Sequence, residues 1–131
     1  MNKTLVSSAL IAALLLIGTE ASAASPAKKA QAGMASYYHD RFNGRRTASG
    51  ARYNKGELSA AHKTLPLGSR VRVTDSRSGR SVVVRINDRG PYARGRVIDL
   101  SRAAASEIGL VSKGVSRVTL EVLKVSGEVG T

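Results

Sequence analysis

Short runs in which hydrophobic and polar residues alternate make up much of the chain. Residues 70–74 (RVRVT) and 117–122 (RVTLEV) alternate at every second position, which predicts strands with one buried face. Residues 81–86 (SVVVRI) are mainly β-branched, which predicts a strand buried on both faces. Shorter strand candidates cover residues 34–38 and 97–100. The pattern therefore indicates a mainly β fold.

The segments between these runs predict one hairpin and one helix. Residues 75–80 (DSRSGR) are polar and contain a glycine, so we expect them to turn the chain between two antiparallel strands. Ser101 is a suitable N-cap for an alanine-rich helix over residues 102–108, and Gly109 stands where such a helix would end. About six short strands and one short helix predict a small β-barrel.

The N-terminal residues 1–23 have the pattern of a secretory signal peptide. Lys3 precedes an apolar run over residues 5–17, and Ala21-Ser22-Ala23 matches the small residues of a cleavage site. The apolar run is ~13 residues long, whereas a membrane span needs ~20, so an uncleaved membrane anchor is the weaker alternative. We therefore expect export to the periplasm or the cell exterior. A flexible leader over 24–32, the barrel over 33–125 and a frayed tail over 126–131 are expected to follow.

Composition narrows the chemistry that we expect. The chain has 131 residues, the length of one domain, and no cysteine. The lack of cysteine excludes a disulfide scaffold, a thiolate zinc site, a cysteine nucleophile and a lipid anchor on a cysteine. Two histidines are too few for a metal site built from histidine alone. We therefore expect no metal site.

The charge of the chain is strongly positive. Lys and Arg total 21 against 9 Asp and Glu, a formal net charge of +12. Outside the cytoplasm the available polyanions are cell-wall polymers and anionic membrane surfaces, so nucleic acid is not an expected partner. Arginines outnumber lysines 14 to 7, which favours planar contacts with carboxylates. A merely solvated basic surface explains the charge equally well.

Three segments are too specific to be ordinary turns. They are GMASYY (33–38) with FNGRRTASG (42–50), LSAAHKTLPLG (58–68), and VRINDRGPY (84–92) with GRVIDLS (95–101). In this order and spacing they closely resemble the rare lipoprotein A (RlpA) family, over roughly residues 33–123. The resemblance implies a six-stranded double-psi β-barrel, an architecture shared with expansins and related wall-loosening proteins.

Members of that family are bacterial septal-ring proteins that act as lytic transglycosylases on peptidoglycan. The resemblance therefore implies a monomer that cleaves MurNAc–GlcNAc bonds within glycan strands, in particular peptide-free ones, and leaves anhydro-muramic ends. Such an enzyme needs an acid to protonate the leaving oxygen. It does not need a second carboxylate to activate water, because the attacking hydroxyl belongs to the substrate sugar, and one carboxyl can serve as acid and later as base. Acid/base chemistry on sugars needs no cofactor, so none is expected.

Asp88 is the first candidate for the acid/base. It directly follows the predicted strand over 81–86 and falls on the same face as its apolar residues, which places a carboxyl at the rim of the barrel. Its protonation state stays open, because burial favours the neutral acid whereas Arg85 and Arg89 favour the carboxylate. His62, which the family resemblance places in the active-site groove, is the second catalytic candidate, in support of the acid. A purely structural role in a loop is the alternative for Asp88, and it is the reading that we favour for Asp99.

Six further residues are candidates for binding the glycan. Aromatic rings stack on the apolar faces of sugars, tyrosine adds a hydroxyl, and arginine pairs with the carboxylates of muramic acid. The candidates are Tyr38, Thr47, Ser49, Asn54, Arg89 and Tyr92.

One departure from the family pattern bears on catalysis. The family has acidic residues directly after Thr-Ala-Ser-Gly and three positions later, where this chain has Ala51 and Asn54. Neither side chain can act as an acid, and Glu57 is a nearby carboxyl that can compensate for their loss. Two alternatives to an enzyme therefore stay open: a barrel that binds glycan without cleaving it, as expansins do, and a periplasmic interaction domain.

Overall fold

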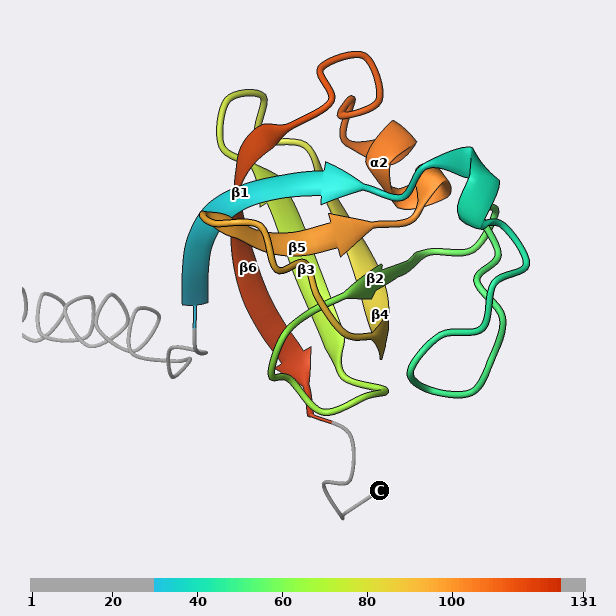
Figure 1. Ribbon diagram of the computed structural model, residues 1–131. Coiled ribbons are helices and arrows are strands. Elements are labelled where there is room, and N and C mark those ends of the chain that lie inside the picture. The colour runs from blue at the N-terminus through green and yellow to red at the C-terminus, as the bar shows by residue number, and fades with distance from the viewer. Residues whose placement is uncertain (1–29, 126–131) are drawn as a thin grey trace, which may run out of the picture.

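Six strands close into a barrel in the computed structural model, which describes residues 30–125 (Figure 1). The predicted signal peptide, the leader up to residue 29 and the predicted tail lie outside the described residues. The strands are β1 (Ala30–Tyr37), β2 (Ser59–Ala61), β3 (Arg70–Asp75), β4 (Ser81–Asp88), β5 (Arg96–Leu100) and β6 (Ser116–Lys124). Because β1 begins at Ala30, residues 30–32 belong to the barrel and not to the leader.

The strand order around the barrel is β1-β5-β2-β4-β3-β6. The pairs β1–β5 and β2–β4 are parallel and the other four pairs are antiparallel. The predicted hairpin is confirmed, because β3 and β4 pair directly on either side of the turn over residues 75–80. The predicted mainly β barrel with one short helix is therefore confirmed.

The barrel interior is filled by the alternating apolar residues of the strands. In β3 and β4 the buried side chains stand at every second position and include Val71, Val73, Val84 and Ile86. The prediction that residues 81–86 are buried on both faces is wrong, because Arg85 is exposed on the outer face of β4.

The helix α2 (Arg102–Glu107) forms where the sequence predicts it. The hydroxyl of Ser101 accepts a hydrogen bond from the main-chain N–H of Ala104 at 3.2 Å, so Ser101 is the N-cap. Gly109 has a φ of +75°, a left-handed conformation that suits the end of a helix. The sequence does not predict the single-turn 3-10 helix η2 (Asp40–Phe42). Within residues 30–125, no helix has the length and apolar character to cross a membrane.

A buried carboxylate connects β3 to β6. Asp75 has no exposed surface and accepts hydrogen bonds from the hydroxyl of Ser116 and from the main-chain N–H of Ser78 at 2.9 Å. Burial alone would raise the pKa of Asp75, but these hydrogen bonds and the ammonium of Lys113 outweigh it and hold the pKa well below its usual range. Asp75 is therefore a charged structural group within the barrel wall.

Candidate active site

Strand pairing brings two carboxyl groups to the same level of the barrel wall. Ala61 of β2 pairs with Asp88 on β4 and with Asp99 on β5, so the two aspartates lie on opposite sides of one small residue. Two strand spacings separate their Cα atoms by about 10 Å, a distance that two aspartate side chains can partly span. Both side chains line one pocket of about 220 Å³ beside the loop that follows β1. The pocket therefore contains two carboxyl groups.

Hydrogen bonds to both carboxyl oxygens hold Asp88 in place. Its Oδ1 accepts from the main-chain N–H groups of Ala48 and Arg89, each at 2.9 Å. Its Oδ2 accepts from the phenol of Tyr38 at 2.5 Å. The side chain is half-buried, and its carboxyl group faces the pocket and not the apolar core. Asp88 is thus a fixed acceptor at the wall of the pocket, where the sequence placed the catalytic carboxyl.

Tyr38 connects Asp88 to an aromatic wall. Its ring stacks on Tyr53, with ring centroids 4.4 Å apart, and meets Phe42 edge-on at 6.2 Å. Burial raises the pKa of Tyr38 far above its usual value, and the hydrogen bond to Asp88 adds to this effect. The phenol therefore keeps its proton and remains a donor to Asp88. The predicted binding residue Tyr38 is in the pocket.

Asp99, for which the sequence favours a structural role, is the second carboxyl group that lines the pocket. Its Oδ1 accepts a hydrogen bond from the hydroxyl of Ser36 at 2.9 Å, and Oδ2 has no hydrogen-bond partner within residues 30–125. Burial raises the pKa of Asp99, although Ser36 and Arg96 act in the opposite direction, and the charge of Asp88 adds a smaller increase. Asp99 therefore holds a proton to higher pH than an ordinary carboxyl. The sequence carries no local signal for this, because Asp99 meets Asp88 only through the pairing of β5 and β4 with β2.

The imidazole of His62 lies outside this pocket. It is buried in a separate hollow of about 310 Å³ that includes Gln31 and Leu65. Its Nδ1 accepts from the main-chain N–H groups of Thr64 and Leu65, each at 3.2 Å, and Nε2 faces the side-chain oxygen of Gln31 at 3.0 Å. The geometry therefore does not support the prediction that the imidazole assists the acid directly. Instead the ring closes the turn that follows β2, and the main-chain N–H of His62 donates to the carbonyl of Asp88 at 3.1 Å.

We expect His62 to contribute to stability in a pH-dependent way. Burial lowers the pKa of His62, and the charges of Arg89 and Lys63 lower it further. As the pH is lowered, His62 therefore becomes protonated in the unfolded chain at a higher pH than in the folded protein. The stabilising contribution of His62 is lost as the pH falls below about 6.5. Replacing the buried hydrogen-bonding ring in His62→Ala should cost about 1–3 kcal/mol at neutral pH. Urea denaturation at several pH values measures both effects.

A matched substitution separates the ring's hydrogen bonds from its charge. His62→Asn keeps an acceptor for the N–H of Thr64 but cannot titrate, so it should recover part of the stability without the loss below about pH 6.5. An equally steep pH dependence in His62→Asn and the wild type would contradict the assignment.

The other predicted binding residues are divided between the pocket and the surface. Thr47 and Arg89 line the pocket. The Nη1 of Arg89 donates to the main-chain carbonyls of His62 at 3.0 Å and Leu65 at 2.7 Å, so Arg89 holds the turn after β2 against the end of β4. Asn54 is exposed, and its Oδ1 accepts from the N–H of Gly56 at 2.8 Å within a turn.

Tyr92 and Ser49 are the two remaining predicted binding residues. The ring of Tyr92 is 76% exposed and does not line the pocket. Ser49 lines a neighbouring groove, and its hydroxyl lies 2.9 Å from that of Thr47 in the pocket wall.

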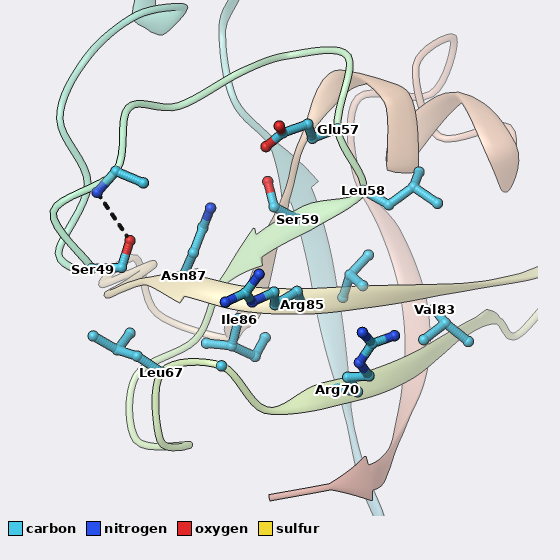
Figure 2. Close-up of a pocket in the computed structure, with 13 residues that line it drawn as sticks. Ser49, Glu57, Leu58, Ser59, Leu67, Arg70, Val83, Arg85, Ile86 and Asn87 are labelled. Carbon is cyan, nitrogen blue, oxygen red and sulfur yellow. Dashed lines mark hydrogen bonds between the residues drawn. The ribbon is translucent and has the colours of Figure 1, made fainter. Parts of the chain in front are cut away.

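That groove has a volume of about 730 Å³ and runs along the outer face of β4 (Figure 2). The segment from Ser49 to Leu58 forms one side and the strands β4 and β3 form the other. Ala51 and Glu57 line this groove and not the carboxyl pocket. Ala51 and Asn54, where the family pattern has acidic residues, therefore both lie outside the pocket that contains Asp88 and Asp99. In the described part of the chain, no group of three or more His, Asp or Glu side chains is placed to hold a metal ion.

The sequence matches one family model and several curated proteins. The model described as lytic transglycolase matches residues 30–120. The endolytic peptidoglycan transglycosylase RlpA of Pasteurella multocida is 59% identical over 96 residues, which are 73% of this chain and 33% of that protein. A probable endolytic peptidoglycan transglycosylase RlpA of Synechocystis is 56% identical over 102 residues, 78% of this chain and 32% of that protein. The chain thus spans about a third of the length of these two relatives.

Solved structures share the fold at lower sequence identity. A papain inhibitor from Streptomyces is 26% identical with a TM-score of 0.60, over 76% of this chain and 98% of that one. An expansin from Clavibacter michiganensis is 18% identical with a TM-score of 0.56, over 73% of this chain and 51% of that one. The expansin likeness supports the barrel fold alone.

Proposed function

Because the chain belongs to the RlpA-type lytic transglycolase family of double-psi β-barrels, we propose that it cleaves peptidoglycan glycan strands. The bond cleaved is the one between N-acetylmuramic acid and N-acetylglucosamine within a strand. The observation that supports this most strongly is the pocket in which Asp88 and Asp99 face the same space. A transglycosylase needs a proton donor and a proton acceptor at one glycosidic bond, and the pocket supplies two carboxyl groups that can take these roles.

Asp99 is the proton donor in this proposal. Burial raises its pKa, and one of its carboxyl oxygens has no hydrogen-bond partner within residues 30–125. The protonated acid gives its proton to the glycosidic oxygen, and the bond between that oxygen and the anomeric carbon of muramic acid breaks. The sugar then carries positive charge as an oxocarbenium-like species.

Asp88 is the proton acceptor. The primary hydroxyl of the same muramic acid attacks the anomeric carbon, and the carboxylate of Asp88 removes the hydroxyl proton. The product is an anhydro-muramic end, and no water is consumed. The two main-chain N–H groups and the phenol of Tyr38 hold Asp88 in one orientation throughout. His62 and Arg89 are positioning residues, because both hold the main chain beside Asp88.

The wall of the pocket suits a sugar ring. Tyr38 and Phe42 supply a partly exposed aromatic surface, and the buried ring of Tyr53 supports Tyr38 from behind. Stacking on aromatic rings suits the apolar face of a saccharide. Arg45 and Arg46 line the same pocket, and the guanidinium of Arg45 lies 4.9 Å from the centre of the Phe42 ring. The rim is thus both aromatic and positively charged, as an anionic glycan requires.

A barrel that binds glycan without cleaving it is the second candidate. The specific observation in its favour is the loss of two carboxyl groups at Ala51 and Asn54. Both positions lie outside the carboxyl pocket, so their change leaves Asp88 and Asp99 in place. We therefore favour the enzyme. We also propose that residues 1–23 direct export and that the protein acts as a monomer on the wall.

Incubation of the purified protein with peptide-free glycan strands separates the two candidates. We expect mass spectrometry to find new anhydro-muramic ends. Co-sedimentation with the strands but no new ends would replace the enzyme with the binding barrel. Neither binding nor cleavage would contradict both and favour an interaction domain.

A further inference from the structure

Two arginines stand directly opposite each other on the outer face of the barrel. Arg70 on β3 and Arg85 on β4 are paired residues of an antiparallel ladder, and both side chains are exposed. Residues paired in this way have Cβ atoms about 4.5–5.5 Å apart, and like charges at such positions destabilise a sheet. Neither guanidinium has an ion-pair or hydrogen-bond partner within residues 30–125. Within the described residues, both guanidinium groups are therefore available to an external anion.

Both arginines line the groove of about 730 Å³ on the outer face of β4. Figure 2 shows their side chains on the strand side of the groove, with Asn87 further along β4 and Ser59 on the neighbouring strand. Glu57 stands on the opposite side and is the only acidic residue among those that line the groove. The volume falls within the usual range of about 300–1,000 Å³ for small-ligand sites.

We propose that the Arg70–Arg85 pair is a subsite for a carboxylate carried by a saccharide. A guanidinium presents two parallel N–H donors to a carboxylate, and two guanidiniums side by side hold one anion more strongly than either does alone. The anion also removes the repulsion between the two cations. The hydroxyls of Ser49 and Ser59 and the amide of Asn87 supply neutral hydrogen bonds for the rest of a sugar.

The position of the groove connects this subsite to the carboxyl pocket. Asn87 lines the groove and the next residue, Asp88, lines the pocket. On the opposite wall, the Ser49 hydroxyl in the groove and the Thr47 hydroxyl in the pocket are 2.9 Å apart. Taken with the proposed function, on which this step rests, a glycan strand with one bond in the pocket would place a neighbouring acidic sugar in the groove.

Isothermal titration with short muramic-acid saccharides tests the subsite without measuring cleavage. For a ligand with a free lactyl carboxylate, Arg70→Gln and Arg85→Gln should each weaken binding about 10-fold or more, the effect of losing a charge-assisted hydrogen bond. Arg77→Gln removes the same charge from the exposed β3–β4 turn and is the matched control, with little expected change. Glu57→Gln should tighten binding, because it removes the carboxylate that faces the anion. The two arginine variants should melt no lower than the wild type, because each removes a like-charge repulsion.

The ligands distinguish the source of the carboxylate. If the lactyl group is the ligand, esterifying it should abolish the difference between wild type and Arg85→Gln. If stem-peptide carboxylates are the ligand, a peptide-bearing saccharide should show the arginine dependence and the bare saccharide should not. Equal affinity of wild type, Arg70→Gln and Arg85→Gln for both ligands would overturn the subsite.

The binding test is independent of the proposed reaction. If the arginine substitutions weaken binding but the protein produces no anhydro ends, the proposed subsite stands and the proposed cleavage reaction is refuted. If the protein cleaves glycan but its arginine variants bind both ligands as tightly as the wild type, the proposed reaction stands and the subsite is refuted.

Discussion

Replacing Asp88 by asparagine is expected to reduce the rate of glycan cleavage by about 10²–10⁴-fold, the usual contribution of one general acid or base. The amide cannot remove a proton from the attacking hydroxyl. The rest of the site should survive, because the amide oxygen still accepts from the N–H groups of Ala48 and Arg89. Its NH₂ group then faces Tyr38, whose phenol can accept as well as donate. The rate of release of anhydro-muramic ends, measured beside the melting temperature, checks this result.

A matched carboxylate elsewhere on the barrel serves as the control for Asp88. Glu121 pairs with Arg72 at 2.8 Å on the β6–β3 wall and lies outside the carboxyl pocket. Glu121→Gln should leave the cleavage rate within about twofold of the wild type, and an exposed ion pair of this kind contributes little stability. Unchanged cleavage in Asp88→Asn, or an equal loss in both variants, would refute the role of Asp88.

Asp99→Asn is expected to cause a similar loss of about 10²–10⁴-fold, because it removes the proton donor. It should also change the pH profile. Cleavage by the wild type requires protonated Asp99, so the rate should fall as the pH rises through the raised pKa of this group. The residual activity of Asp99→Asn should lack that alkaline fall. The pH dependence of kcat/KM on soluble glycan fragments measures both.

Ser36→Ala tests the same group without removing it. The Ser36 hydroxyl donates to Asp99 and holds its pKa down, in opposition to burial. Without that hydroxyl the pKa of Asp99 should rise, and the alkaline fall of activity should move to higher pH. A shift to lower pH, or an identical profile in Ser36→Ala and the wild type, would exclude Asp99 as the group that titrates.

The regular parts of the barrel could be predicted because their signals are local. Alternation in residues 70–74 marks the buried Val71 and Val73, and the capping hydroxyl of Ser101 lies beside the helix that it begins. Asp88 could be found for a similar reason, since it ends a strand whose apolar residues point to the core.

The rest of the site depends on contacts between distant residues. Asp99 becomes a partner of Asp88 only because β2 lies between β5 and β4, and no local pattern contains that order. The surroundings of the His62 ring could not be predicted for the same reason, because its Nε2 faces Gln31 on another strand. Arg85 was assigned to a doubly buried strand because β-branched neighbours surround it, whereas the outer face of β4 is open.

The most direct test of the central claim is the mass of the cleavage products formed in heavy-oxygen water. If Asp99 protonates the leaving oxygen and Asp88 activates the sugar's own hydroxyl, every new muramic end is an anhydro end that contains no heavy oxygen. Reducing ends that carry heavy oxygen from the solvent would show hydrolysis instead, and would contradict the account.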